Sequence, residues 1–208
     1  DEDGPAPMLT VAQQAIADGV NQYPPGPGIP QLRQAIAAQR TRHYGIDYDP
    51  DTEVLVTVGG TEAIAAAVIG LVEPGSDVLI IAPFYDSYSP VIAMAGCRRV
   101  VVPLAPDDHG FAIDVDRLRA AITPATRALI LNSPHNPTGM VATHDELTAI
   151  AALAIEHDLL VITDEVYEQL TFDGHQHRPL AGYPGMAERT VTISSAAKMF
   201  NCTGWKIG

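Results

Sequence analysis

The amino-acid sequence predicts an α/β protein built on a mostly parallel β-sheet with helices on both faces. Hydrophobic residues make up 47% of the 208 residues and charged residues 18%, which is enough apolar surface for a substantial core. Short β-branched runs lack the polar alternation of a half-exposed strand, so each is expected to be buried on both faces. Helical stretches separate most of these runs, which is the pattern of parallel strands joined by crossover helices.

Six strands and four helices are expected from this pattern. The strands cover residues 54–58, 78–81, 100–102, 128–131, 159–163 and 190–193, and the helices cover residues 61–72, 87–95, 114–122 and 146–157. Thr10 with Gln13, and Thr143 with Glu146, fit the capping box that starts a helix. In such sheets ligands bind where strands end and helices begin, so we expect the chemistry at those junctions.

The overall composition excludes several classes of partner and compartment. Lys and Arg total 12 against 25 Asp and Glu, so the net charge of −13 repels nucleic acid. The longest apolar run, residues 63–72, is shorter than the ~18 residues of a membrane span. Cys97 and Cys202 form no Cys-x-x-Cys pair, which favours a reducing cytoplasm. The chain starts without Met and stops directly after a motif, so we expect a piece of a longer protein.

Two glycines mark the first junction between a predicted strand and a predicted helix. Gly59 and Gly60 precede Thr61 and Glu62, and backbone N–H groups at a helix start can bind a phosphate. The same pattern also fits an ordinary turn, and it matches neither a P-loop nor a dinucleotide fingerprint. The side chain of Glu62 must point away from any phosphate bound there.

Aromatic residues gather after the next predicted strand. Phe84, Tyr85 and Tyr88 lie within five residues of one another. Such residues usually pack in a core, but at a strand end an aromatic ring can also stack on a flat ligand. Both interpretations stay open from these residues alone.

The next two strands end in polar side chains. Asn136 lies in the segment 132–139, and Asp164 closes an apolar and β-branched run ahead of Glu165 and Tyr167. A buried Asp164 needs a cationic partner, which is either a ligand or the Arg or Lys of a structural pair. Glu165 should leave the strand on the opposite face, and we expect it to be the less critical carboxylate.

Lys198 follows the last predicted strand after four small residues. Its amine is expected to project into a tight, partly dry space, where its pKa can fall and the free base can act as a nucleophile. Cys202 has no evident base partner and is expected to pack as a small side chain. His175 and His177 lie in a polar loop and are expected to be exposed to solvent, so no metal is assigned.

Taken together and in this order, these motifs resemble the class I/II aminotransferases, pyridoxal 5'-phosphate enzymes of fold type I. The motifs are Asn-Pro-Thr-Gly, Asp-x-x-Tyr and Ser-x-x-Lys with a basic residue eight positions after the lysine. The resemblance implies a three-layer α/β/α large domain at residues 23–208, truncated on its C-terminal side, and an incomplete N-terminal arm at residues 1–22. It also implies that the small C-terminal domain, with the Arg that binds the substrate carboxylate, lies outside this chain.

The resemblance further implies a role for each motif residue. Lys198 would form the Schiff base with pyridoxal 5'-phosphate and move the proton in catalysis, and Asp164 would pair with the pyridine nitrogen. Asn136 and Tyr167 would hydrogen-bond the phenolic oxygen, and Tyr85 would stack on the ring. The phosphate would be bound by Gly60, Thr61, Glu62, Ser195 and Lys206, and in a homodimer by Tyr23 of the neighbouring subunit. Lys206 stands where many members have Arg, so it keeps the charge but loses the bidentate fork.

The finer pattern is most similar to the actinobacterial N-succinyldiaminopimelate aminotransferase branch of lysine biosynthesis. The expected reaction transfers an amino group from N-succinyl-LL-2,6-diaminopimelate to 2-oxoglutarate in the cytoplasm. One alternative is a kynurenine or glutamine type of aminotransferase, or a cysteine-S-conjugate β-lyase, which needs the same residues. A more remote alternative is the non-catalytic effector domain of a transcription regulator.

Overall fold

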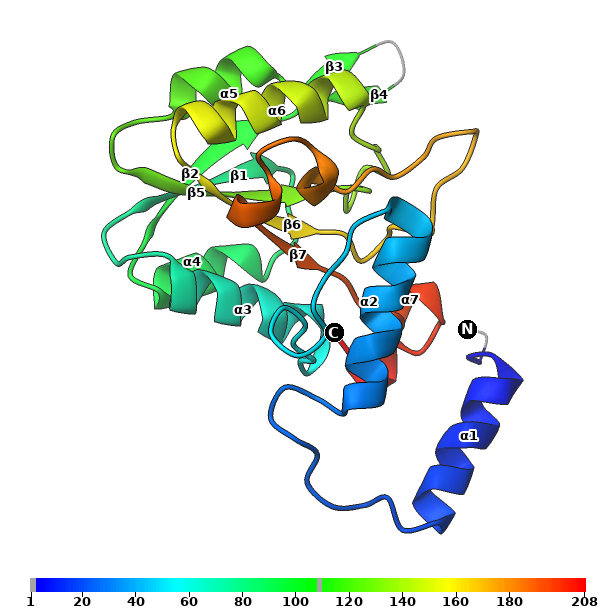
Figure 1. Ribbon diagram of the computed structural model, residues 1–208. Helices are drawn as coiled ribbons and strands as arrows, with labels where there is room; N and C mark the ends of the chain where they lie inside the picture. The colour runs from blue at the N-terminus through cyan, green and yellow to red at the C-terminus, as the bar shows by residue number, and fades with distance from the viewer. Residues whose placement is uncertain (1–2, 108–109) are drawn as a thin grey trace.

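A five-stranded sheet with the order β2-β1-β5-β6-β7 forms the centre of the computed structural model, which describes residues 3–107 and 110–208. Every pair of neighbouring strands in it is parallel (Figure 1). The strands are β1 (Asp77–Ala82), β2 (Arg98–Pro103), β5 (Thr126–Asn132), β6 (Leu160–Asp164) and β7 (Thr190–Ile193). Each one overlaps a predicted run, with β6 shifted by one residue, so the mostly parallel α/β class is confirmed.

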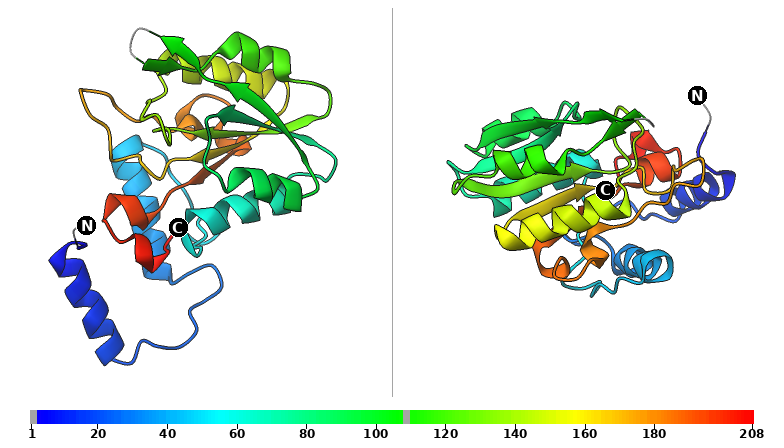
Figure 2. Two further views of the ribbon diagram at one scale, coloured as in Figure 1. Left: turned by 180° about the vertical axis from the view of Figure 1, so that it is seen from behind. Right: turned by 90° about the horizontal axis from the view of Figure 1, so that it is seen from above.

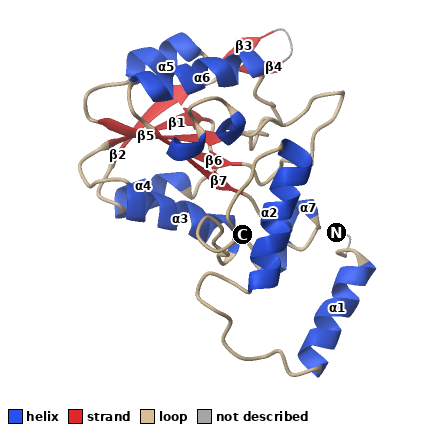
Figure 3. Ribbon diagram, in the orientation of Figure 1, coloured by secondary structure: helices blue, strands red, loops and turns tan. Residues whose placement is uncertain are grey.

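Helices cover both faces of this sheet (Figures 2 and 3). One face carries α3 (Gly59–Leu71) and α4 (Tyr88–Met94), and the other carries α5 (Val115–Ala121) and α6 (His144–Glu156). Two clusters of buried apolar side chains fill the space between the layers. On β1, Leu79 belongs to one cluster and Ile80 to the other, which is why the strand shows no polar alternation.

The two predicted capping boxes have different outcomes. The backbone N–H of Glu146 donates to Thr143 Oγ1 at 3.2 Å, and the Glu146 carboxylate accepts from the Thr143 N–H at 2.7 Å, so this box is confirmed. The box at Thr10 is wrong, because helix α1 (Ala6–Ala17) has already begun there with a proline in its first turn. The Thr10 hydroxyl instead donates to the carbonyl of Ala6 at 3.0 Å.

The predicted strand at residues 54–58 is also wrong. Within the described ranges, its pairing is one isolated bridge between Val58 and Ile207. Thr57 exchanges backbone hydrogen bonds with Gly208 at 2.7 and 3.0 Å, while the Val56 N–H donates to Pro27 at 3.0 Å. Because two different segments satisfy these backbone groups, no continuous ladder forms.

The remaining elements were not expected from the sequence. They are α2 (Pro30–Tyr44), the hairpin of β3 (Ala105–Asp107) and β4 (Gly110–Ala112), α7 (Ala196–Met199), and the 3₁₀ turns Leu180–Gly182, Ala187–Arg189 and Thr203–Trp205. Helix α2 lacks a clean apolar stripe, and two of its buried residues are Arg33 and Arg40. Helix α1 has no buried residue and stands apart from the sheet in Figure 1. The domain division at residue 22 stays a prediction.

The described residues bear on the expectations about a membrane span and about the two cysteines. Their helices include none that is both long and apolar enough to cross a membrane. Cys97 and Cys202 are both free thiols, and Cys202 is buried as expected of a small packing side chain.

Candidate active site

The carboxyl ends of the parallel strands meet at one edge of the sheet, and most predicted site residues follow them. Tyr85 comes after β1, Asn136 after β5, and Lys198 lies in α7 after β7, while Asp164 is the last residue of β6. The start of α3 reaches the same edge, because a Cβ added at Gly60 would lie 3.3 Å from Val166 and 3.8 Å from Ile193. The fold therefore gathers residues that are far apart in the sequence.

Asp164 is a buried carboxylate with no Arg or Lys partner in the part of the chain that the structure describes. It is 4% exposed, and it accepts hydrogen bonds from the Tyr88 hydroxyl at 2.6 Å and the Val166 N–H at 3.3 Å. Burial raises the pKa of Asp164 above its ordinary value, and these two hydrogen bonds offset only part of that rise. A positively charged ligand group beside it would favour the ionised form.

Tyr88 is the aromatic residue that supports Asp164. It is 2% exposed, and its ring meets that of Tyr85 edge-on with 5.8 Å between centroids. Burial and the Asp164 charge raise the pKa of Tyr88, so its hydroxyl remains a donor. Tyr85 is 37% exposed, so its ring remains accessible at the strand end. The aromatic run thus divides into a core residue and an accessible one.

Asn132 holds the loop that carries Asn136 against the end of β6. Its side-chain amide donates to the carbonyls of Asp164 at 2.8 Å and Pro134 at 3.2 Å, and its carbonyl accepts from the Asn136 N–H at 2.7 Å. Asn132 is buried, and these contacts use most of its hydrogen-bonding capacity. Sequence reasoning gave it no role, although a polar residue that ends a buried strand is a usable signal.

Lys198 lies beside Tyr167, with 5.8 Å from its Nζ to the centre of the tyrosine ring. The preceding Ser195 caps the short helix α7 by accepting the Ala197 N–H at 3.0 Å. Lys198 is nevertheless exposed, so the expectation of a tight, partly dry space is wrong for the described residues. The reason is that α7 is a single turn beyond the strand end, at the rim of the sheet rather than beneath another layer.

The first turn of α3 forms a backbone cradle suited to an anion. Gly59 has a φ of 78°, a left-handed conformation that glycine adopts without strain. The Glu62 carboxylate binds the N–H of Val58, ahead of the helix. Lys206 lies next to Gly59, since a Cβ added at Gly59 would be 3.8 Å from the Lys206 Cα. N–H groups in a first helical turn lack intrahelical acceptors and favour negative charge.

One predicted residue lies outside this arrangement. Tyr23 is 98% exposed, in the segment between α1 and α2. The resemblance assigns it to the site of a neighbouring subunit, and an exposed ring is compatible with that role. Its role therefore stays a prediction.

A second polar cluster, which we call the Arg40 network, lies in the interior and consists of Arg40, Glu165, Glu168, His177 and Ser194. Arg40 binds Glu165 and Glu168, each at 2.7 Å. His177 Nε2 lies 3.0 Å from Glu165, and the Ser194 hydroxyl donates to Glu168 at 2.7 Å. The His177 side chain is 3% exposed, so its predicted exposure is wrong, because Glu165 holds the ring in the interior. His175 is exposed as expected.

The Arg40 network brings together groups that a metal ion could use. Ligand atoms of Glu165, Glu168 and His177 lie within 4.8 Å of one another. The Arg40 guanidinium already binds both carboxylates and supplies the positive charge that they need. The Arg40 Nε and the His177 Nδ1 are buried without a hydrogen-bond partner among the described residues, but both carboxylates are already paired with a cation. The cluster is therefore an ionic network rather than a metal centre.

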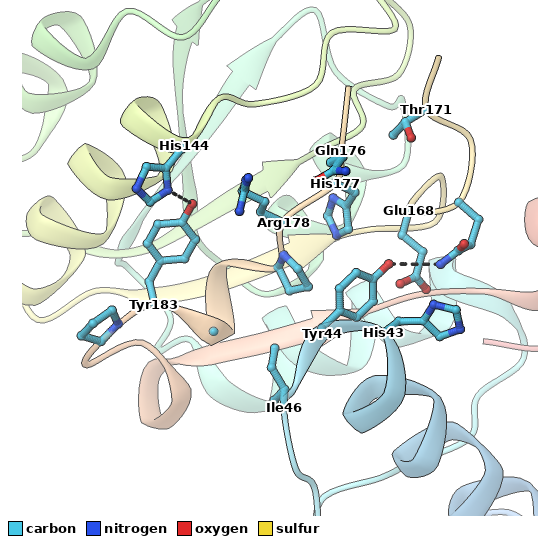
Figure 4. A pocket seen from close by; sticks show the side chains of 14 residues that line it. His43, Tyr44, Ile46, His144, Glu168, Thr171, Gln176, His177, Arg178 and Tyr183 are labelled. Atoms are coloured by element: carbon cyan, nitrogen blue, oxygen red, sulfur yellow. Dashed lines mark hydrogen bonds between the residues drawn. The ribbon is translucent and has the colours of Figure 1, made fainter. Parts of the chain in front are cut away.

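A hollow of about 720 Å³ opens beside the Arg40 network (Figure 4). Tyr44 and Glu168 are in its walls, and Gln169 donates to the Tyr44 hydroxyl at 3.2 Å. His144 and Tyr183 lie on the opposite wall, with 2.9 Å between the His144 Nδ1 and the Tyr183 hydroxyl oxygen. None of the residues predicted to bind the cofactor lines this hollow.

Several known proteins with similar sequences are aminotransferases. A probable N-succinyldiaminopimelate aminotransferase of Mycobacterium tuberculosis is 74% identical over 208 residues, which cover 100% of this chain and 52% of that protein. Kynurenine–oxoglutarate transaminase 3 of Rattus norvegicus is 43% identical over 206 residues, which cover 95% of this chain and 45% of that protein. The chain thus spans about half the length of these relatives.

Solved structures and the family profile agree with these relatives. The structure of the N-succinyldiaminopimelate aminotransferase from Mycobacterium tuberculosis matches with a TM-score of 0.99 at 74% identity, covering 100% of this chain and 54% of that chain. The profile of the family described as "Aminotransferase class I and II" matches residues 3–208. With its strand-end site and its parallel sheet, the chain belongs to the class I and II aminotransferases.

Proposed function

We propose that this chain forms the cofactor-binding part of a pyridoxal 5'-phosphate-dependent aminotransferase. The observation that carries the proposal is the environment of Asp164, a buried carboxylate that no Arg or Lys of the described residues neutralises. A protonated pyridine nitrogen would supply the missing cation and offset the cost of burying the charge. Tyr85 and Tyr167 lie at the same strand ends, with Lys198 beside Tyr167.

Each residue at the strand ends has a task in this proposal. Lys198 would hold the cofactor aldehyde covalently and, once released, would move a proton on its Nζ. Asn136 and Tyr167 would donate hydrogen bonds to the phenolic oxygen, while Tyr85 would stack on the ring. When bound, pyridoxal 5'-phosphate supplies an electron sink for bonds at the amino-acid Cα.

The phosphate would be held at the start of α3. The backbone N–H groups of Gly60, Thr61 and Glu62 lie at the positive end of the helix dipole, and Lys206 adds a full charge. The Ser195 hydroxyl donates to the Ile207 carbonyl at 3.0 Å, so it must rotate to donate to a phosphate oxygen. The residues present therefore fit the cofactor, with one side-chain rearrangement.

N-succinyl-LL-2,6-diaminopimelate and 2-oxoglutarate are the substrates that we propose for the complete enzyme. The relative that is 74% identical supports this choice, because it is a probable N-succinyldiaminopimelate aminotransferase. We also propose a cytoplasmic homodimer in which residues 1–22 form an arm outside the large domain. The lack of any buried residue in α1 supports such an arm.

The test of function is a half-reaction screen of the full-length protein with single amino acids. Loss of the visible absorbance of the bound cofactor on adding N-succinyl-LL-2,6-diaminopimelate, with glutamate formed after 2-oxoglutarate is supplied, is the expected result. The 43% identical kynurenine transaminase makes kynurenine the appropriate competing donor. Pyruvate and ammonia from a cysteine conjugate would instead indicate a β-lyase, and no spectral change with any donor would contradict the proposal.

Tyr88→Phe is expected to lower turnover about tenfold with the fold intact. The change removes the hydroxyl that donates to Asp164 at 2.6 Å. Because this hydrogen bond lowers the pKa of Asp164, its loss raises that pKa further, and the acidic limb of the kcat/KM profile should move to higher pH. Pre-steady-state rates between pH 5 and 8 measure this, and an unmoved acidic limb would show that Tyr88 acts by packing alone.

Tyr23→Phe tests the proposed homodimer. The side chain is 98% exposed, so its hydroxyl is available to a neighbouring subunit. We expect several-fold faster loss of cofactor from the dimer and no change in a form kept monomeric by dilution, because the lost hydrogen bond would cross the interface. Cofactor release measured by gel filtration at both concentrations decides this, and an equal effect in both forms would contradict a contribution from the partner.

A further inference from the structure

The Arg40 network joins the two strand ends that carry the proposed cofactor anchors. Glu168, in the loop after β6, accepts the hydroxyl of Ser194, the residue directly after β7, at 2.7 Å. The same Glu168 binds Arg40 of α2 through its other carboxylate oxygen at 2.7 Å. One carboxylate therefore connects α2, the loop after β6 and the chain that leads into α7.

The network members are sequence neighbours of the proposed site residues. Glu165 follows Asp164, Glu168 follows Tyr167, and Ser194 precedes Ser195. Asp164 binds Tyr88, whereas Glu165 binds Arg40, so adjacent carboxylates have separate partners. The network thus binds the same backbone segments that carry the proposed site residues, through the side chains of adjacent residues.

Backbone pairing between β6 and β7 ends where the network begins. The last paired residues are Asp164 and Ile193, and the Glu165 N–H donates to the Ile193 carbonyl at 2.7 Å. Beyond this point the Glu168–Ser194 bond is the next hydrogen bond between the two chain segments among the described residues. It is placed to hold the start of α7 against the loop that carries Tyr167.

The charges in the network are buried and strongly held. Arg40, Glu165 and Glu168 have side chains that are 2–5% exposed, and the Tyr44 ring lies 4.7 Å from the guanidinium carbon. Burial lowers the pKa of Arg40, but the charges of the two glutamates outweigh this and raise it. Because a buried charge that loses its partner is costly, Glu168 cannot leave Arg40 to follow a moving Ser194. Glu168 is therefore a rigid acceptor.

We propose that the Glu168–Ser194 hydrogen bond is a positioning contact that sets Lys198 relative to Asp164 and Tyr167. The proposal rests on the proposed function, since it concerns how well Lys198 is placed to capture the cofactor aldehyde. Glu168 and Ser194 are not among the residues that we propose bind the cofactor, so they would act through the backbone of their neighbours.

Ser194→Ala is the test, because it removes this hydrogen bond and leaves both ion pairs of Arg40 intact. Thr190→Val is the matched control, since Thr190 lies at the other end of β7 and its buried hydroxyl has no hydrogen-bond partner in the described structure. Full-length apo forms of both variants and of the unaltered protein are mixed with pyridoxal 5'-phosphate. Fluorescence reports binding, and the visible absorbance reports covalent capture by Lys198.

Ser194→Ala is expected to slow covalent capture about tenfold, while Thr190→Val captures at the unaltered rate and both variants melt within a few degrees of the unaltered protein. A capture rate in Ser194→Ala equal to that of the control would overturn the inference. If the unaltered protein binds no cofactor, the proposed function fails. Amide exchange in apo protein still tests the contact, because α7 must exchange faster in Ser194→Ala than in Thr190→Val, and equal exchange rejects it.

Discussion

Lys198→Ala is expected to abolish covalent binding of pyridoxal 5'-phosphate and to lower aminotransfer on the order of 10⁴-fold or more. Within this chain, Lys198 and Lys206 are the two lysines whose amines could react with the aldehyde. Lys198 is the one whose Nζ lies beside the Tyr167 ring, at 5.8 Å from its centre. Lys206 lies next to Gly59 at the start of α3, where its charge suits a phosphate rather than an aldehyde.

Two measurements check this result in the full-length protein. The visible absorbance of the bound cofactor should be missing in Lys198→Ala, and reductive trapping followed by peptide mapping of the unaltered protein should label Lys198. Arg127→Ala is a suitable control, since Arg127 is exposed at the opposite, amino end of β5 and binds only nearby carbonyls in the described structure. Retention of the absorbance in Lys198→Ala, or a label on Lys206, would refute the assignment.

Asp164→Asn is expected to have opposite effects on stability and on activity. Burial raises the pKa of Asp164 in the folded chain, so its charged form is less stable there than in the unfolded chain. The contribution of Asp164 to the free energy of unfolding is therefore largest at low pH, where the carboxyl is protonated. It becomes smaller as the pH rises through the pKa of Asp164 in the folded chain. The neutral amide removes that loss, so the apo variant should be more resistant to urea at neutral pH than the unaltered apo protein.

The same change should weaken catalysis about a hundredfold or more, because an amide cannot keep a pyridine nitrogen protonated. Single-turnover rates with saturating amino acid, together with urea melts of apo and cofactor-bound forms, measure both effects. The difference in urea resistance between the cofactor-bound and apo forms should be smaller for the variant than for the unaltered protein, because the apo variant is itself more stable. A rate close to that of the unaltered protein would reject the pairing of Asp164 with a pyridinium.

Much of the fold could be predicted because buried parallel strands have a recognisable composition. The run that became β7, residues 190–193, has the same bounds in the structure, since β-branched residues between turn signals have few alternatives. Residues 54–58 have a similar composition but form no strand, because their backbone partners come from Pro27 and Gly208. Composition indicates that a segment can pair, and tertiary contacts decide whether a partner lies alongside it.

The candidate site could be predicted only in part from the sequence. Asp164 was recognised as a buried strand-end carboxylate, and its burial is confirmed. Its hydrogen bond from Tyr88 could not be inferred, because 76 residues separate the two and no local pattern links them. Arg40 was missed for a similar reason, since it belongs to a helix with mixed faces and binds Glu168 across 128 residues.

The amino-acid sequence by itself determined which segments could be buried, which residues would end the strands, and the order in which those ends follow one another. Only the tertiary structure decided that Asp164 would receive a tyrosine hydroxyl and no Arg or Lys of the described residues, that His177 would be interior, and that Lys198 would stand exposed at the rim. The physical reason is the distance along the sequence over which each interaction acts. Burial patterns and helix caps act within a few residues, whereas a buried charge is satisfied by whichever group the folded sheet brings within about 3 Å.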